Sequence, residues 1–90
     1  MEAPIKSLLL RNNVILISQI IEMDSELGEP NCKLINPCEI NDQGQELSFK
    51  FWMNSISDQK TFMIQSENII TIMDVKINVL KSYLDFLENN

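Results

Sequence analysis

The chain has 90 residues, a formal net charge of −6 and 44% hydrophobic residues. This length makes one domain with a small core, and the apolar content excludes an intrinsically disordered chain. The seven lysines and arginines are spread singly along the sequence, so no basic arm is available to neutralise nucleic-acid phosphates. We expect such a small domain to gain burial by forming a homo-oligomer.

The sequence lacks one side chain that is common in enzyme active sites and zinc sites. It contains no histidine, which removes the commonest general base and the usual nitrogen ligand of zinc. Ser48, Ser55 and Ser57 have no visible base to activate them. Cys32 and Cys38 are expected in the core, since free cysteine is among the most often buried residue types. We therefore predict a protein that is not an enzyme and that binds no metal or cofactor.

The chain shows no sign of membrane targeting. Its N-terminus lacks the apolar segment and the cleavage site of a signal peptide, and no apolar run approaches the length of a membrane span. We expect a cytoplasmic protein without membrane contact.

The first half of the chain predicts strands joined by polar turns. Residues 4–10 suit either one helical turn or a short first strand. The dipeptide Asn12-Asn13 predicts a tight hairpin turn, because asparagine tolerates left-handed backbone conformations. Residues 14–23 are rich in β-branched side chains and predict a strand that is buried for most of its length. After an acidic loop over residues 24–30, a further strand over residues 32–40 contains Pro37 at an edge position or a bulge. Its apolar residues share one parity: Cys32, Leu34, Cys38 and Ile40.

The second half alternates clearly and then becomes helical. Residues 41–45 predict a turn, and the strand that follows has a face formed by Leu47, Phe49, Phe51 and Met53. Trp52 falls on the opposite face with Lys50. After a loop over residues 55–60, residues 62–64 and 69–72 predict two strands separated by the polar corner 65–67. Asp74 is placed to cap a helix that covers the open end or a face of the sheet. The apolar stripe of this helix carries Leu80, Tyr83, Leu84 and Leu87, widened by Val79 and Phe86.

Two segments resemble the sequence motifs of the Sm-like (LSm) family of small RNA-associated β-barrels. The first matches the family's spacing at Asn12, Asn13, Leu16, Ser18, Ile20 and Asp24, with other residues in place of both family glycines. The second matches at Ile64, Gln65, Ser66, Glu67, Asn68, Ile69 and Ile72, with Gln65 where the family has arginine. The resemblance covers about residues 8–73. The convincing helix follows this region, whereas the family's helix usually precedes the barrel.

The resemblance implies a mostly β fold with a five-stranded Sm-like barrel over about residues 8–73 and a C-terminal helix over about 74–88, in a single domain of residues 1–90. It further implies a closed ring in which an edge strand of one protomer pairs with its neighbour. Single-stranded RNA is the implied ligand, with Gln65 and Asn68 contacting a base through their amide groups. Trp52 is expected to act as an interface anchor or a stacking residue.

An alternative function is a protein-interaction or structural module of the same fold that does not bind RNA. The net charge of −6 and the replacement of arginine by Gln65 both favour it. In this interpretation Asn68 fixes the turn through its own side chain, Gln65 is solvated, and Trp52 contacts a protein partner.

Overall fold

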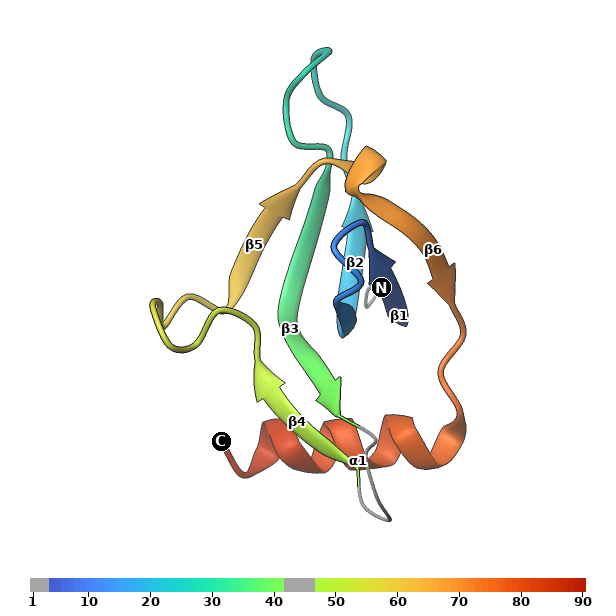
Figure 1. Cartoon of the computed structure of the whole chain (residues 1–90), viewed down its shortest axis with the longest axis vertical. Helices are drawn as coiled ribbons and strands as arrows, with labels where there is room; N and C mark the ends of the chain where they lie inside the picture. The colour runs from blue at the N-terminus through green and yellow to red at the C-terminus, as the bar shows by residue number, and fades with distance from the viewer. Residues whose placement is uncertain (1–3, 42–46) are drawn as a thin grey trace.

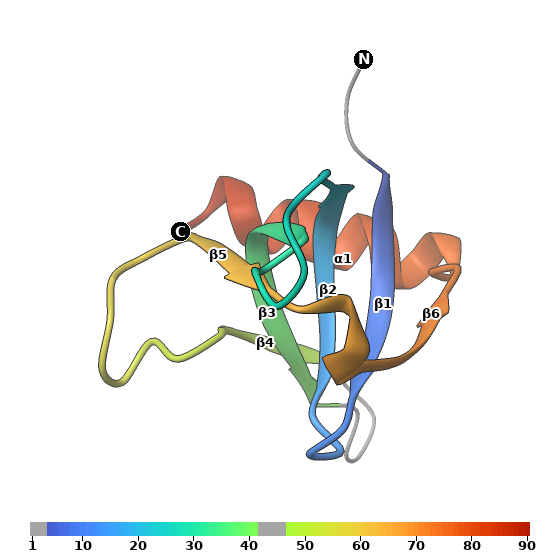
Figure 2. The same cartoon turned by 90° about the horizontal axis from the view of Figure 1, so that it is seen from above.

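The fold is mostly β, as the sequence predicts, with one C-terminal helix. The computed structural model describes residues 4–41 and 47–90. Its strands are β1 (Ile5–Leu10), β2 (Ile15–Glu22), β3 (Cys32–Asn41), β4 (Ser48–Phe51), β5 (Thr61–Ile64) and β6 (Ile69–Met73). A single 3-10 turn, η1 (Ser66–Asn68), joins β5 to β6, and helix α1 (Ile77–Glu88) follows. The strands form one antiparallel sheet, and α1 lies across one of its faces near the end that carries β4 (Figures 1 and 2).

The first hairpin confirms the turn predicted at Asn12-Asn13. Residues 5–10 are a strand, so the helical alternative is wrong. Asn13 has φ of +66°, the left-handed conformation that asparagine tolerates. The amide of Val14 donates to Asn12 Oδ1 at 3.2 Å, so the side chain of Asn12 closes the turn. The predicted turn over residues 41–45 lies largely outside the described residues.

The sheet is open, so the predicted five-stranded barrel is wrong in both strand number and closure. The strand order is β4-β3-β2-β1-β6, and β5 pairs with β3 as a sixth strand. β4 and β5 share one side of β3, each covering about half of it. Among the described residues no pairing joins β6 to β4 or β5. Much of the apolar surface on one sheet face is instead covered by α1.

A bulge in β3 explains why both faces of the sheet are apolar. Ile17 of β2 lies opposite Cys38, whereas Gln19 lies opposite Ile35, so β3 carries one extra residue at the Asn36-Pro37 step. This is the bulge that Pro37 predicts, because proline has no amide hydrogen for the ladder. A shift of one residue moves the following side chains to the other face. Cys38 and Ile40 therefore do not share a face with Cys32 and Leu34, contrary to their common parity in the sequence.

The core is divided into two clusters, one on each face of the sheet. The first is built on Leu8, Leu10, Leu16, Ile20, Cys32 and Leu34 and is bordered by Trp52 and Phe62. The second lies between the sheet and α1 and contains the buried Ile17, Cys38 and Tyr83. Phe49 and Phe51 of β4 pack into this second cluster beside Phe86. Because β2 contributes to both clusters, its burial along most of its length is confirmed.

The helix differs from its prediction at its start and along one face. It begins at Ile77, and its first turn has no side-chain cap. Asp74 instead forms an ion pair with Lys6, 68 residues away in the sequence. That lysine lowers the pKa of Asp74 through its hydrogen bond and its charge. Tyr83 is fully buried as predicted, but Leu84 is 44% exposed.

Replacing Asn36 tests the bulge. Asn36 has φ of +54°, which strains a β-branched residue by about 1–2 kcal/mol. We expect Asn36→Val to lower the free energy of unfolding by about that amount in urea titrations. The matched control Asn36→Gly should stay within about 0.5 kcal/mol of the parent, because glycine adopts this conformation freely. Equal stability of the two variants would contradict the strained bulge.

Candidate functional site

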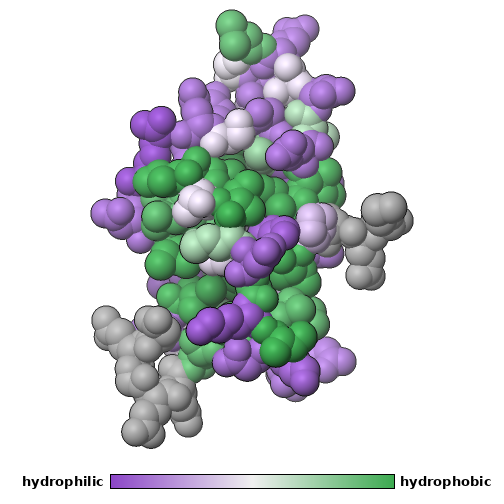
Figure 3. Space-filling view, turned by 90° about the vertical axis from the view of Figure 1, so that its right-hand side faces the viewer, coloured by the Kyte–Doolittle hydropathy of each residue, from purple (hydrophilic) through white to green (hydrophobic). Residues whose placement is uncertain are grey.

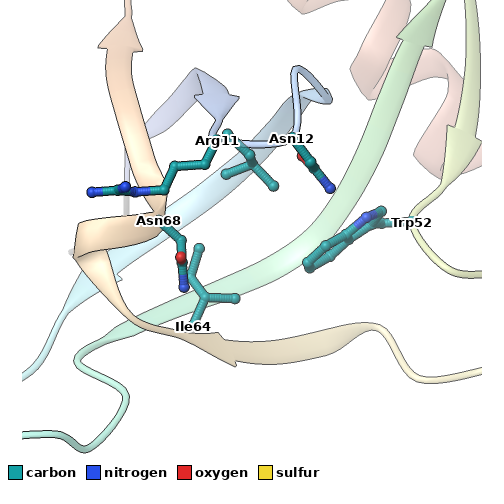
Figure 4. Close-up of a pocket in the computed structure, with 6 residues that line it drawn as sticks. Arg11, Asn12, Trp52, Ile64 and Asn68 are labelled. Atoms are coloured by element: carbon teal, nitrogen blue, oxygen red, sulfur yellow. The ribbon is translucent and has the colours of Figure 1, made fainter.

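Two of the three predicted site residues meet in one hollow. Trp52 and Asn68 line it together with Arg11 and Asn12 (Figure 4). Leu10 and Ile64 supply its apolar lining, and its volume is about 250 Å³. The hollow lies between the turn of the first hairpin and η1. It therefore combines an indole ring, two primary amides and an aliphatic surface.

Arg11 holds the two sides of the hollow together. Its backbone amide donates to the carbonyl of Asn68 at 3.0 Å, and its Nε donates to the carbonyl of Glu67 at 2.6 Å. The hairpin turn is thus attached to η1 through backbone and side chain. Figure 4 shows the Arg11 side chain directed away from Trp52, whereas the Asn12 side chain is directed toward it. The guanidinium therefore positions the walls of the hollow rather than filling it.

Trp52 is fixed by the core on one side and borders the hollow on the other. Its backbone amide donates to the carbonyl of Pro37 at 2.9 Å. Its ring packs against Phe62, with centroids 5.1 Å apart. Phe51, its neighbour in sequence, belongs to the helix-side cluster, so the two aromatic residues lie on opposite sides, as strand alternation predicts. The half-buried Trp52 remains a predicted anchor or stacking residue.

Gln65, the third predicted residue, lies elsewhere. Its Nε2 donates to the carbonyl of Gly28 at 2.7 Å, which attaches it to the acidic loop. Asn31 strengthens this connection, because its side chain accepts from the Ser66 amide at 2.8 Å and donates to Ser66 Oγ at 2.9 Å. The carboxylates of Glu26, Glu29 and Glu67 line the same region. Gln65 and Asn68 thus line different depressions, and the one at Gln65 is acidic.

The lysines that RNA binding requires are partly engaged within the chain. Lys50 forms an ion pair with Glu39 at 3.4 Å. The Lys60 ammonium lies 4.1 Å from the centre of the Phe51 ring. If RNA binds, Lys33 would have to converge with these two lysines near one surface. An RNA surface built on these three lysines gains no support from their surroundings.

Arg11, Asn12, Leu10 and Ile64 were not predicted as site residues. Arg11 directly precedes the predicted turn Asn12-Asn13. A positively charged residue beside a polar turn was the feature of the sequence that could have indicated it as a site residue. Its contact with Glu67 and Asn68 joins segments 56 residues apart, so no local pattern contains it. The sequence predicts Asn68 and Trp52 separately as site residues, without the hairpin that joins them.

A second surface of interest is formed by strand edges. Every residue of β6 is half-buried or exposed on both faces, and Ile70, Ile72 and Met73 are 58%, 45% and 39% exposed. Figure 3 shows the side of the molecule that carries β6, where hydrophobic side chains form a broad area. On the opposite edge of the sheet, Met63 of β5 is 44% exposed. Within the described part of the chain, β5 and β6 each pair on one side only.

A family model described as a family of unknown function, DUF6561, matches residues 3–88. No curated protein matches the chain. In the described ranges, no helix has both the length and the apolar character needed to cross a bilayer. In those same ranges no three cysteine, aspartate or glutamate side chains gather closely enough to hold a metal ion.

The two cysteines are buried free thiols, as predicted. Burial raises the pKa of Cys38 from 9.0 to about 12, against a smaller lowering by the charge of Lys60. Burial also raises the pKa of Cys32, with a further contribution from Glu22. The thiolate is the reactive form of cysteine, so neither residue is activated as a nucleophile.

Stability should fall at alkaline pH because of Cys38. A folded-state pKa above the unfolded one means that the native state binds more protons between pH 9.0 and about 12. The free energy of unfolding should therefore decrease as the pH rises through this range. Urea titrations across the range should show a shallower decrease for Cys38→Ala than for the parent chain. Cys32 and Tyr83, whose pKa values burial also raises, should contribute to the remaining slope. An unchanged slope in Cys38→Ala would contradict the assignment.

Proposed function

The chain belongs to the DUF6561 family, and we propose from its own geometry that it is a non-enzymatic assembly module whose copies join edge to edge. In this assembly, β6 of one copy pairs with β5 of the next. The observation that carries the proposal is the exposed, uncharged edge strand β6. Its sequence, Ile-Ile-Thr-Ile-Met, contains no charge and no proline. Natural edge strands normally use charged residues and proline to prevent pairing with another chain.

We infer that β5, rather than β4, is the partner of β6, because β5 matches β6 in length and in its lack of charge. β5 has four residues and β6 has five, and β5 likewise contains no charged residue or proline. β4 carries Lys50, an exposed charge, in its middle. Pairing β5 with β6 joins two different surfaces, so each added copy presents the same free edges again. Such contacts close into a ring or continue as a filament, according to the rotation between copies. The ring is the form that the resemblance to the Sm-like family implies.

The acidic charge gives the assembly a distinctive salt dependence. Each copy carries a net charge of −6, so the copies repel one another at low ionic strength and less so when salt screens them. Association through uncharged edges should therefore strengthen as salt is added. RNA binding at Gln65 and Asn68 would weaken with salt instead. That RNA function remains a prediction, and the carboxylates beside Gln65 weigh against it.

A charge placed on β6 should prevent assembly. We expect light scattering to show a multimer for the parent chain and a monomer for Ile70→Lys, since a lysine on an edge strand opposes pairing with another chain. The apparent dissociation constant should rise at least about tenfold, equivalent to about 1.4 kcal/mol. Leu84→Lys is the matched control, because Leu84 is 44% exposed on α1 and lies outside both edge strands. It should assemble like the parent.

Mixing two edge variants distinguishes the pairing mode. Met63→Lys carries the charge on β5, so it should also be monomeric alone. A mixture with Ile70→Lys retains one intact β5 and one intact β6, and should form dimers and nothing larger. If Met63→Lys alone forms dimers, the strands pair β6 to β6. A parent chain that stays monomeric at all concentrations and salt levels would overturn the proposal.

A further inference from the structure

We infer that the hollow formed by Trp52, Asn12 and Asn68 binds a flat nitrogen heterocycle of the nucleobase type. This inference does not rest on the proposed assembly, because the described walls of the hollow come from a single chain. The ligand is identified by three features of the hollow: an aromatic surface, paired amide groups and limited size.

The aromatic surface is supplied by Trp52. Its indole is held against Phe62 and the first core cluster, so little ordering is required when a ring packs on it. An aromatic side chain can stack on any base, because every base has a π-face. Leu10 is buried and Ile64 half-buried in the same lining. A flat ring thus finds apolar contact on more than one side.

The amides of Asn12 and Asn68 supply the polar contacts. Asn12 Oδ1 already accepts from the Val14 amide, which leaves its Nδ2 to donate. The side chain of Asn68 is exposed, and no hydrogen bond binds it to another described residue. A primary amide presents both a donor and an acceptor, the combination that base edges complement. The backbone carbonyl of Asn68 is held by Arg11, so the backbone that carries this amide is fixed beside the hollow.

The size and charge of the hollow define which part of a ligand is recognised. Its volume of about 250 Å³ lies below the ~300–1,000 Å³ typical of pockets for drug-sized ligands. One ring system fits inside, and a sugar or phosphate would remain outside. The Nε of Arg11 is engaged with Glu67 and its side chain points away from Trp52. The heterocycle, rather than an anionic group, is therefore the recognised element.

The single tryptophan makes a direct test possible. Trp52 is the only tryptophan in the sequence, so intrinsic fluorescence reports on this wall of the hollow alone. The full chain should be titrated with adenosine, guanosine, cytidine and uridine. We expect saturable quenching by at least one of them, together with a shift of the Trp52 indole N–H resonance in proton NMR spectra. The four nucleosides are neutral, so binding should depend little on salt.

A second series separates free nucleosides from nucleic acid as the source. The same titration should be made with the corresponding monophosphate and with a short single-stranded oligonucleotide of the preferred base. Tighter binding of the oligonucleotide that weakens with salt would identify a strand as the source. Equal or weaker binding, as expected for a chain of net charge −6, would identify the free nucleoside or nucleotide.

Variants locate the binding site. Asn68→Ala should weaken the best nucleoside at least about tenfold, whereas Asn78→Ala, at an exposed position of α1, should bind like the parent. Titration of Ile70→Lys should give the parent affinity, so a failure of assembly leaves this result unaffected. The inference is overturned if no nucleoside quenches the parent or shifts the indole resonance. It is equally overturned if folded Asn68→Ala binds as tightly as the parent.

Discussion

The fold depends on the bulge at Asn36-Pro37 in β3. Three hydrogen bonds from distant segments, and a fourth from the neighbouring Cys38, meet there or beside it. The amide of Asn36 donates to the Lys60 carbonyl at 2.7 Å, and the hydroxyl of buried Tyr83 donates to the Asn36 carbonyl at 2.7 Å. The Trp52 amide and the Cys38 thiol complete the set, donating to Pro37 and Asn36 carbonyls. The bulge thus connects β5, α1 and the turn after β4 to one point of the central strand.

The bulge also determines which surfaces remain uncovered. By changing the direction of β3, it gives β5 and β4 separate halves of one strand edge. It also turns Cys38 toward α1, so the helix packs on one face of the sheet while the other face forms its own cluster. A sheet stabilised in this way does not need closure to bury its core. Within the described residues β5 and β6, like β4, therefore each keep a free edge, and neither β5 nor β6 carries a charge that would protect it.

The features that could be predicted from the sequence are those that depend only on residues close together in the chain. The strand at residues 14–23, the corner at 65–67 and the burial of Tyr83 follow from alternation, turn chemistry and helical spacing. Pro37 signalled a bulge, but the change of face at Cys38 depends on its pairing with Ile17. Asp74 met the local requirement for a cap, yet Lys6 is its partner. The ligand hollow was also invisible, since Trp52 and Asn68 become neighbours only through the first hairpin.

The hollow and the exposed edge are parts of one continuous segment. Asn68 ends η1, and Ile69 begins β6 as the next residue. Arg11 holds the start of this segment through the carbonyls of Glu67 and Asn68, and the Lys6–Asp74 pair holds the chain just beyond Met73. β6 is therefore fixed at both ends while its side chains and outer edge stay exposed. A strand held in this way loses less conformational entropy on pairing than a frayed one, so its edge is already organised for a partner.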